Sequence, residues 1–482
     1  MRNLVAAIMK TGSGSIANLL FGMASVKIIA MLLGPSGVGL FSLIRQTMQT
    51  LAVVGLGGQT ALVQGVASKD GADRDDYIRT TFWIFILGSA LTSLLIVSLA
   101  PLLSFFLFGK NDPQLVSLVR WIALPVVLAN TYIYFKSLLN GFRAIGRLAL
   151  VEMLGPLVML LIIYPAGLLV GKGYVLVFVW MLSVSQFLMM LSSLGVVYRN
   201  GWISFGLIRA NIDKAASKYF FRIAGTTLLT ALLSTGSILV VRAMVTKYGG
   251  LHEAGLFDLA WTLSGAYVML LLGSFGTYYM PALSGTSDPS ERLVLIRQVI
   301  RLSTLLMVPM IVCVISLKPL VVRIFYTSEF LPSLKLVQWM LIGDYFKITC
   351  WVLAIPAIAH AKMKVYFWTE TFWYIGFMFL SALSIYGFGE LQGIAMAFVA
   401  LYACLLVFYL VYLRRVYGLR LTSDFVSLWL IGLVIVVMAS WQTWDNSDVN
   451  WRVSLFFMAI SCLFVWIMLK KEERKKMIMW LR

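Results

Sequence analysis

The chain has 482 residues, of which 61% are hydrophobic and 12% are charged, and its mean hydropathy is +0.91. A soluble protein of this length has too little interior to bury so much apolar surface, which excludes an ordinary globular protein. The formal net charge of +19 would suggest a nucleic-acid partner for a soluble protein. Here most Lys and Arg lie between apolar runs, so membrane topology explains them, and we expect no nucleic acid as a partner.

Roughly 14 apolar runs are long enough to cross a bilayer, which takes about 20 mostly apolar residues in a helix. Lipid offers no hydrogen-bond partners to the backbone, so such runs form helices. In chain order the expected spans are 11–33, 38–66, 81–108, 114–140, 148–170, 173–198, 219–247, 254–283, 299–326, 333–358, 365–387, 391–413, 425–443 and 452–470. The sequence therefore predicts an all-α, polytopic membrane protein.

The basic residues predict the orientation of these spans. With both termini in the cytoplasm, about 27 Lys and Arg fall in the inside loops and ends, whereas about 8, including Lys110, Lys172 and Lys318, fall outside. This asymmetry follows the positive-inside rule. We therefore expect a multi-pass protein with both termini cytoplasmic.

Several short segments recur at nearly one spacing. GVGLFSL at 37–43 returns as EAGLFDL at 253–259. LVRW at 118–121 returns as LVQW at 336–339, and Glu152 returns as Glu370 at the same offset. Such internal similarity is typical of transporters that contain two related halves.

The repeat predicts the domain organisation. Six spans in each half would give both halves the same orientation, with the substrate bound between them and alternating access as the mechanism. The expected domains are an N-terminal six-helix lobe at 1–210, a C-terminal six-helix lobe at 211–417, and two further helices with a basic tail at 418–482.

Ionisable residues inside the spans are the first candidates for function, because charges are costly in lipid. The cations are Lys27, Arg45, Arg242 and Lys347, and the acids are Asp258 and Asp344. Four positive charges against two negative ones predict a net cationic cavity, which suits an anion such as a diphosphate. Gln46 and Gln49 follow Arg45 and would line a path for sugars on the same helix.

Structural explanations compete with these roles. Arg242 and Asp258 could form an ion pair between neighbouring helices. Asp344 and Lys347 are three residues apart and could pair along one helix. Lys27 could extend its amine to the membrane surface.

Glu152 and Glu370 lie near the starts of spans 148–170 and 365–387. They could couple transport to a proton or cation gradient, or could stabilise the first turn of a helix through its dipole. The four cysteines have no CxxC spacing and the two histidines have no metal-ligand spacing, so we expect no metal and no cofactor. No nucleophile–base motif, HExxH or Walker A sequence occurs, so we do not expect an enzyme.

Four segments resemble a known family: GPSGVGLFSLIRQTMQTLAVVGLGG (34–58), GFRAIG (141–146), TYYMPALS (277–284) and WMLIGDYFKI (339–348). They are similar to Wzx-type O-antigen and lipid-linked oligosaccharide flippases of the multidrug/oligosaccharidyl-lipid/polysaccharide (MOP) exporter superfamily. The likeness is greatest to the type that flips lipid III, the lipid intermediate of enterobacterial common antigen. It covers about the first twelve spans, whereas the last two resemble those of the fourteen-helix lipid II flippases.

The resemblance implies a flippase of the bacterial inner membrane. Its substrate would be an undecaprenyl-diphosphate-linked oligosaccharide repeat unit, moved to the periplasmic leaflet for O-antigen or another surface polysaccharide. Expected partners are that glycan, the bilayer, a polysaccharide polymerase and a chain-length regulator. The last two helices would form a groove for the lipid tail or be a peripheral addition. The alternatives are a cation-coupled drug exporter of the same superfamily, expected to have an acidic and aromatic cavity, and a membrane-embedded polysaccharide polymerase or ligase.

Overall fold

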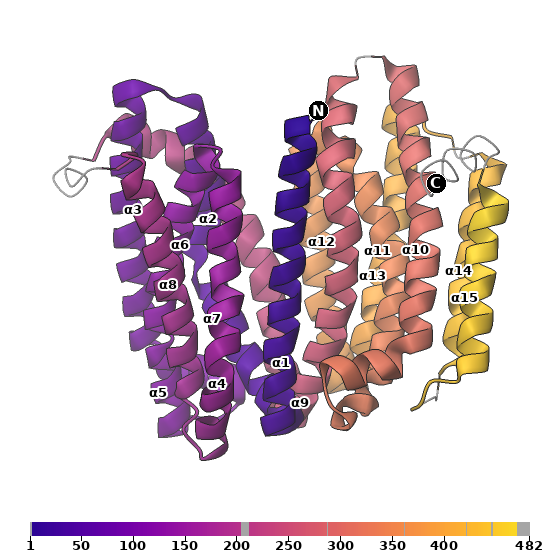
Figure 1. Ribbon diagram of the computed structural model, residues 1–482, viewed down its shortest axis with the longest axis horizontal. Coiled ribbons are helices and arrows are strands. Elements are labelled where there is room, and N and C mark those ends of the chain that lie inside the picture. The colour runs from indigo at the N-terminus through magenta and orange to yellow at the C-terminus, as the bar shows by residue number, and fades with distance from the viewer. Residues whose placement is uncertain are drawn as a thin grey trace. The chain divides into compact units, whose positions relative to one another are not determined.

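The computed structural model describes residues 2–203, 212–286, 288–360, 362–420, 422–444 and 447–469, without the side chains of 2–17, 270–278 and 281. Within these ranges every regular element is helical, as Figure 1 shows. The all-α class predicted from hydropathy is therefore confirmed. The basic tail predicted at 470–482 lies outside the described residues.

The helices follow one another with short connections. In chain order they are α1 (Arg2–Leu51), α2 (Val53–Ser68), α3 (Gly71–Ser98), α4 (Ala100–Phe108), α5 (Pro113–Trp121), α6 (Ala123–Gly141), α7 (Ile145–Gly171), α8 (Val177–Arg199), α9 (Lys214–Gly285), α10 (Pro289–Phe325), the short η2 (Ser328–Ser333), α11 (Leu334–Ala359), α12 (Met363–Ala382), η3 (Leu383–Phe388), α13 (Gln392–Tyr417), α14 (Ser423–Gln442) and α15 (Trp451–Met468).

Twelve helical stretches in the described ranges are long and apolar enough to cross a membrane. Two of them, Asn18–Leu51 and Lys214–Met269, contain a sharp kink and cover parts of two predicted spans each. The twelve stretches therefore agree roughly with the 14 predicted helices. The long, glycine-rich span predicted at 38–66 is interrupted at Ala52, where α1 ends and α2 begins.

The two kinks occur at glycines that match in the internal repeat. Gly34 has φ 60° and Gly250 has φ 77°, a left-handed backbone that glycine adopts without a Cβ clash. Gly34 and Gly250 are separated by the offset that relates GVGLFSL to EAGLFDL, so the shared distortion supports the repeat predicted from the sequence.

The ends of helices also fall at matching positions in the two repeats. The α6 helix ends at Gly141 and α11 ends at Ala359, while α7 begins at Ile145 and α12 begins at Met363. Both pairs are separated by the offset that relates the LVRW and LVQW segments. Residues of α6 and α7 can therefore be compared with residues of α11 and α12 position by position.

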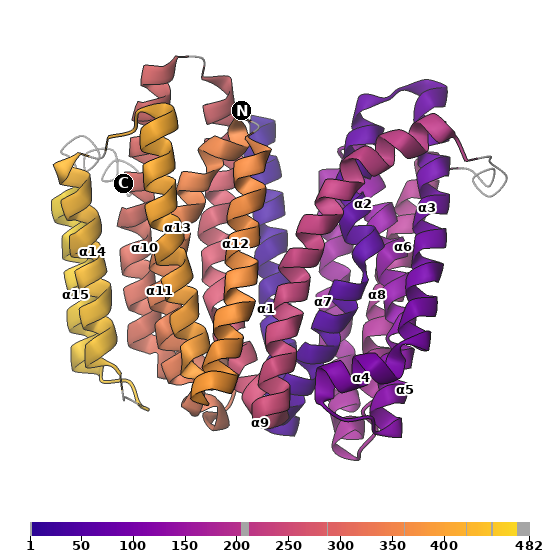
Figure 2. The same ribbon diagram turned by 180° about the vertical axis from the view of Figure 1, so that it is seen from behind.

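The chain forms two compact units, Met1–Gly255 and Leu256–Arg482, here called the first and second unit. In the first, α6 packs against α2 and α8, and α7 packs against α1. In the second, α11 packs against α10 and α13, and the neighbouring helices α14 and α15 both pack on α10 (Figure 2). The lobe borders predicted at 210 and 417 stay a prediction.

Large apolar side chains cover the outer faces of many helices. On α3, Leu91, Leu94 and Leu95 are all exposed, and Leu161 of α7 and Trp441 of α14 are 70% and 76% exposed. A protein surrounded by water would not leave so many large apolar residues uncovered. Lipid contact accounts for these faces, as expected of a multi-span membrane protein.

Candidate functional site

Arg45 lies near the end of α1 and is half-buried. Its guanidinium carbon is 5.5 Å from the centre of the Phe41 ring, one helical turn earlier. Among the described residues no acidic side chain forms an ion pair with Arg45. A guanidinium stacked on a ring and without an acidic partner keeps most of its positive charge available to an anion.

Gln46, predicted to line the same path, makes a helix contact within the first unit. Its side-chain amide donates to the Thr235 carbonyl of α9 at 3.1 Å, and Thr50 donates to that carbonyl at the same distance. These two bonds tie the end of α1 to α9. Gln49 is exposed and remains available for a ligand.

The other two candidate cations of the first unit already have interaction partners. Lys27 is half-buried on α1, Arg242 is 4% exposed on α9, and both have interaction partners. Asp258 belongs to the second unit, where it is buried and also has a partner. The ion pair predicted between Arg242 and Asp258 would join the two units and stays a prediction.

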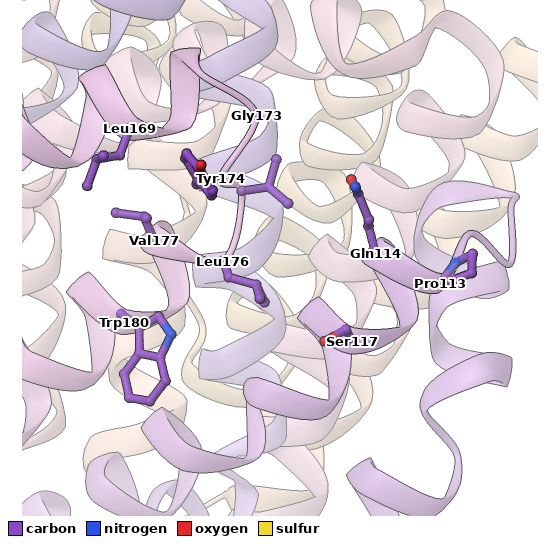
Figure 3. A pocket seen from close by; sticks show the side chains of 10 residues that line it. Pro113, Gln114, Ser117, Leu169, Gly173, Tyr174, Leu176, Val177 and Trp180 are labelled. Carbon is purple, nitrogen blue, oxygen red and sulfur yellow. The ribbon is translucent and has the colours of Figure 1, made fainter.

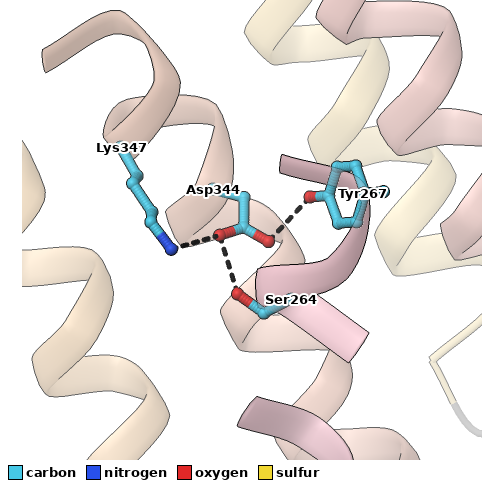
Figure 4. Close-up of polar contacts among 4 residues, drawn as sticks. All are labelled: Ser264, Tyr267, Asp344 and Lys347. Atoms are coloured by element: carbon cyan, nitrogen blue, oxygen red, sulfur yellow. Dashed lines mark hydrogen bonds and ion pairs between the residues drawn. The ribbon is translucent and has the colours of Figure 1, made fainter. Parts of the chain in front are cut away.

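Asp344 of α11 is the centre of a polar cluster in the second unit (Figure 4). It is fully buried and accepts hydrogen bonds from Ser264 at 2.8 Å and Tyr267 at 2.7 Å, both on α9. The amine of Lys347 lies 3.9 Å from one carboxylate oxygen and 5.5 Å from the Phe398 ring centre. The local pairing considered for Asp344 and Lys347 is therefore present in the structure.

Two partners of this cluster, Ser264 and Tyr267, were not among the predicted site residues. Both are polar, lie three positions apart in an apolar span and so share one helix face. This spacing could have identified Ser264 and Tyr267 as candidate site residues from the sequence. Their partner on α11, however, could not be named without the packing of the two helices.

The two glutamates at equivalent repeat positions have different surroundings. Glu152 on α7 forms an ion pair with Lys136 on α6, with 2.6 Å between amine and carboxylate. Glu370 on α12 is half-buried and accepts a hydrogen bond from Tyr374. In the described part of the chain no group of three or more His, Cys, Asp or Glu could hold a metal ion.

Lys318 was counted among the outside positive charges, and the structure corrects this assignment. It lies inside α10, is fully buried and donates to the side-chain oxygen of Gln338 on α11. The Gln338 amide in turn donates to the carbonyl and hydroxyl of Ser440 on α14. Lys318 therefore takes part in a polar junction of α10, α11 and α14 instead of marking a loop.

A cavity of about 670 Å³ lies in the first unit, where α7 ends and α8 begins (Figure 3). Gln114 and Ser117 of α5 contribute polar groups, while Tyr174 and Trp180 contribute aromatic rings. Trp180 also packs on Trp121, with ring centres 5.0 Å apart. None of the predicted site residues lines this cavity, and its rings fit the aromatic belt at a membrane surface.

Comparison with known sequences gives a clear family match. The sequence pattern of the family described as "Polysaccharide biosynthesis protein" matches residues 28–335. The lipid III flippase of Escherichia coli (strain K12) is 24% identical over 408 residues, which cover 83% of this chain and 95% of that protein. The lipid III flippase of Shigella flexneri matches equally.

Solved structures with the same fold are also known. The lipid II flippase MurJ in an inward closed conformation superposes with a TM-score of 0.73 at 15% identity, covering 96% of this chain and 98% of that one. An inward-facing multidrug resistance MATE family transporter of the MOP superfamily gives 0.68 at 14% identity, covering 83% and 94%. At these identities the likeness shows the fold alone.

Proposed function

Because the chain belongs to the polysaccharide biosynthesis protein family, we propose that it is a flippase for a lipid-linked oligosaccharide. The substrate carries its sugars on undecaprenyl diphosphate. It moves from the cytoplasmic to the periplasmic leaflet of a bacterial inner membrane, for O-antigen or another surface polysaccharide. The protein acts as a transporter without a catalytic centre. The lipid III flippases that match most of its length support this proposal.

The environment of Arg45 is the structural observation that carries the proposal. A diphosphate needs a positive counter-charge when it leaves water, and Arg presents a planar fork that matches phosphate oxygens. Arg45 is half-buried in a span, stacked on Phe41, and forms no ion pair with a described acid. The exposed Gln49 one turn further on offers an amide to a sugar. Lys27 and Arg242 of the first unit and Lys347 of the second unit are proposed as further positive charges for the anion, besides the interactions that each already makes.

Energy coupling is assigned in this proposal to acidic residues of the spans. Asp344 is the first choice, because its shell of Ser264, Tyr267 and Lys347 would rearrange on gain or loss of a proton or cation. Asp258, Glu152 and Glu370 are the further candidates. A charge moved through the membrane field would respond by about 2.3 kcal/mol per 100 mV.

The last two helices are assigned to the lipid tail. A cavity of about 210 Å³ lies where α14 meets α10, α11 and α13, and the side chains around it include Ile300, Leu353, Leu406, Phe425 and Leu430. Such a largely apolar lining suits a polyisoprenyl chain. A polysaccharide polymerase and a chain-length regulator are the protein partners in this scheme.

Deletion of the gene tests the proposal directly. We expect an undecaprenyl-linked glycan to accumulate on the cytoplasmic side of the membrane, where mass spectrometry of extracted lipids identifies its sugars. Reintroducing the gene should clear that intermediate and restore the surface polysaccharide. Loss of drug efflux without any accumulated glycan would contradict the proposal and favour an exporter of the same superfamily.

A further inference from the structure

A third cavity, of about 420 Å³, lies wholly inside the second unit, and none of the predicted cations lines it. It is surrounded by the second half of α11, the first half of α12 and the middle of α13. Six of its lining residues are aromatic, namely Trp351, Tyr366, Trp373, Tyr374, Tyr402 and Tyr409. Glu370 is the one acid among the described lining residues, which include no Lys or Arg.

The first repeat contains the same acid with a cation beside it. There Glu152 is neutralised by Lys136, at 2.6 Å. At the matching positions of the second repeat, Glu370 is kept but Lys136 is replaced by Ala354, which lines the cavity. The matching ends of the helices that carry these residues make the comparison secure. The second unit therefore keeps the carboxylate, as Glu370, without the lysine that pairs with the equivalent Glu152 in the first unit.

The aromatic walls are also a feature of the second repeat. Trp373 occupies the position that is Gly155 in the first repeat. Its ring stacks on Phe377 with centres 5.0 Å apart, and its centre lies 5.1 Å from that of Tyr402. Rings held by such packing form a preorganised surface whose faces attract a positive charge.

We propose that this cavity binds an organic monocation, a protonated amine or a quaternary ammonium compound, with Glu370 as its counter-charge and Trp373 and Tyr402 as ring walls. The volume supports an organic ligand, since a bare metal ion would leave most of the space empty and sites of this size hold small organic molecules. Two lining residues, Met269 and Trp351, are exposed, so the cavity is open to its surroundings.

Binding at this site can be tested without any glycolipid. The purified full-length protein in nanodiscs is titrated with tetraethylammonium, and binding is followed by calorimetry and by tryptophan fluorescence. Glu370→Gln removes the charge and keeps the shape, so we expect it to weaken binding by about tenfold or more. Ala354→Lys rebuilds the ion pair of the first repeat inside the cavity and should abolish binding.

Glu390→Gln is the matched control, because Glu390 is an exposed carboxylate of the same unit and lies outside the cavity. It should bind tetraethylammonium as the parent protein does. Gel filtration and a melting curve for each variant separate lost binding from lost folding. Equal affinity of the parent, Glu370→Gln and Ala354→Lys would overturn the proposal. Binding of Na⁺ with no binding of tetraethylammonium would overturn it in favour of an inorganic ion.

Discussion

At the scale of single residues, this chain holds intramembrane charges in two different ways. Asp344 is fully enclosed by two hydroxyl donors and one amine, so its charge is balanced by the protein itself. Arg45 has a ring on one side and no described acid in an ion pair, so its charge is left for a ligand. An enclosed charge such as that of Asp344 stabilises helix packing while its shell stays intact and can respond to a proton or cation, whereas a charge such as that of Arg45 is suited to binding an anion.

Removing the enclosed acid should therefore destabilise the protein. In Asp344→Ala, the hydroxyls of Ser264 and Tyr267 lose their acceptor and the amine of Lys347 loses its counter-charge. We expect a loss of stability on the order of 3 kcal/mol, because one member of a buried pair remains uncompensated. Thermal unfolding of the purified protein in detergent measures this change.

A double variant distinguishes this mechanism from simple loss of packing. Adding Lys347→Met to Asp344→Ala removes the uncompensated amine, so the double variant should be more stable than the single variant. Asp448→Ala is the control, since Asp448 pairs with Arg323 at the surface and should cost little. Additive losses in the double variant would show that Asp344 and Lys347 do not act as a pair.

At the scale of elements, the helices and the two sharp breaks between them were predictable, and the contacts between helices were not. Runs of apolar residues predict spans because lipid leaves the backbone no other partner. The predicted spans stop at 33 and 247 and start again at 38 and 254, so both turning points, Gly34 of α1 and Gly250 of α9, were predicted to lie between spans. The buried position of Lys318 was missed, because its partner Gln338 lies on another helix, α11.

The repeat-related kinks bring two backbone contacts together in the first unit. A Cβ built at Gly39 would lie 2.1 Å from the Leu251 carbonyl oxygen, and one built at Gly255 would lie 2.0 Å from the Pro35 carbonyl oxygen. Gly39 matches Gly255 in the repeat, and Pro35 matches Leu251 at the same offset. The two kinked segments, around Gly34 and Gly250, therefore contact each other closely at glycines that are equivalent in the repeat.

Gly39→Ala should disrupt this contact, because the neighbour is backbone and cannot move aside as a side chain could. We expect a loss of about 1–3 kcal/mol, as for overpacking of a close contact. Gly22→Ala on the same helix is the control, since nothing lies within 4 Å of a Cβ there and alanine favours helix by up to about 1 kcal/mol. Melting temperatures of both variants in detergent provide the comparison. A Gly39→Ala protein as stable as Gly22→Ala would refute the close contact.

At the scale of the whole molecule, sequence reasoning reached the class, the approximate number of helices and the family. It reached these because hydropathy and repeated segments are properties of the chain itself. Which charges are neutralised depends on contacts between distant residues, as the bond from Gln46 to Thr235 and the cluster around Asp344 illustrate. The sequence therefore identifies candidate site residues by their charge inside the membrane. The contacts of each residue in the structure then distinguish residues suited to binding from residues with a structural role.

The central claim is that Arg45 supplies positive charge to a diphosphate-linked glycan as it crosses the membrane. The most direct measurement is the initial rate at which purified protein in liposomes moves a fluorescent undecaprenyl-diphosphate oligosaccharide between leaflets. The account predicts that Arg45→Ala lowers this rate by about 10- to 100-fold, because one charge-assisted interaction of roughly 1.5–3 kcal/mol is lost. Arg45→Lys should keep part of the rate, and Lys172→Ala at an exposed position should keep all of it. Folded Arg45→Ala protein that moves the glycolipid as fast as the parent would contradict the account.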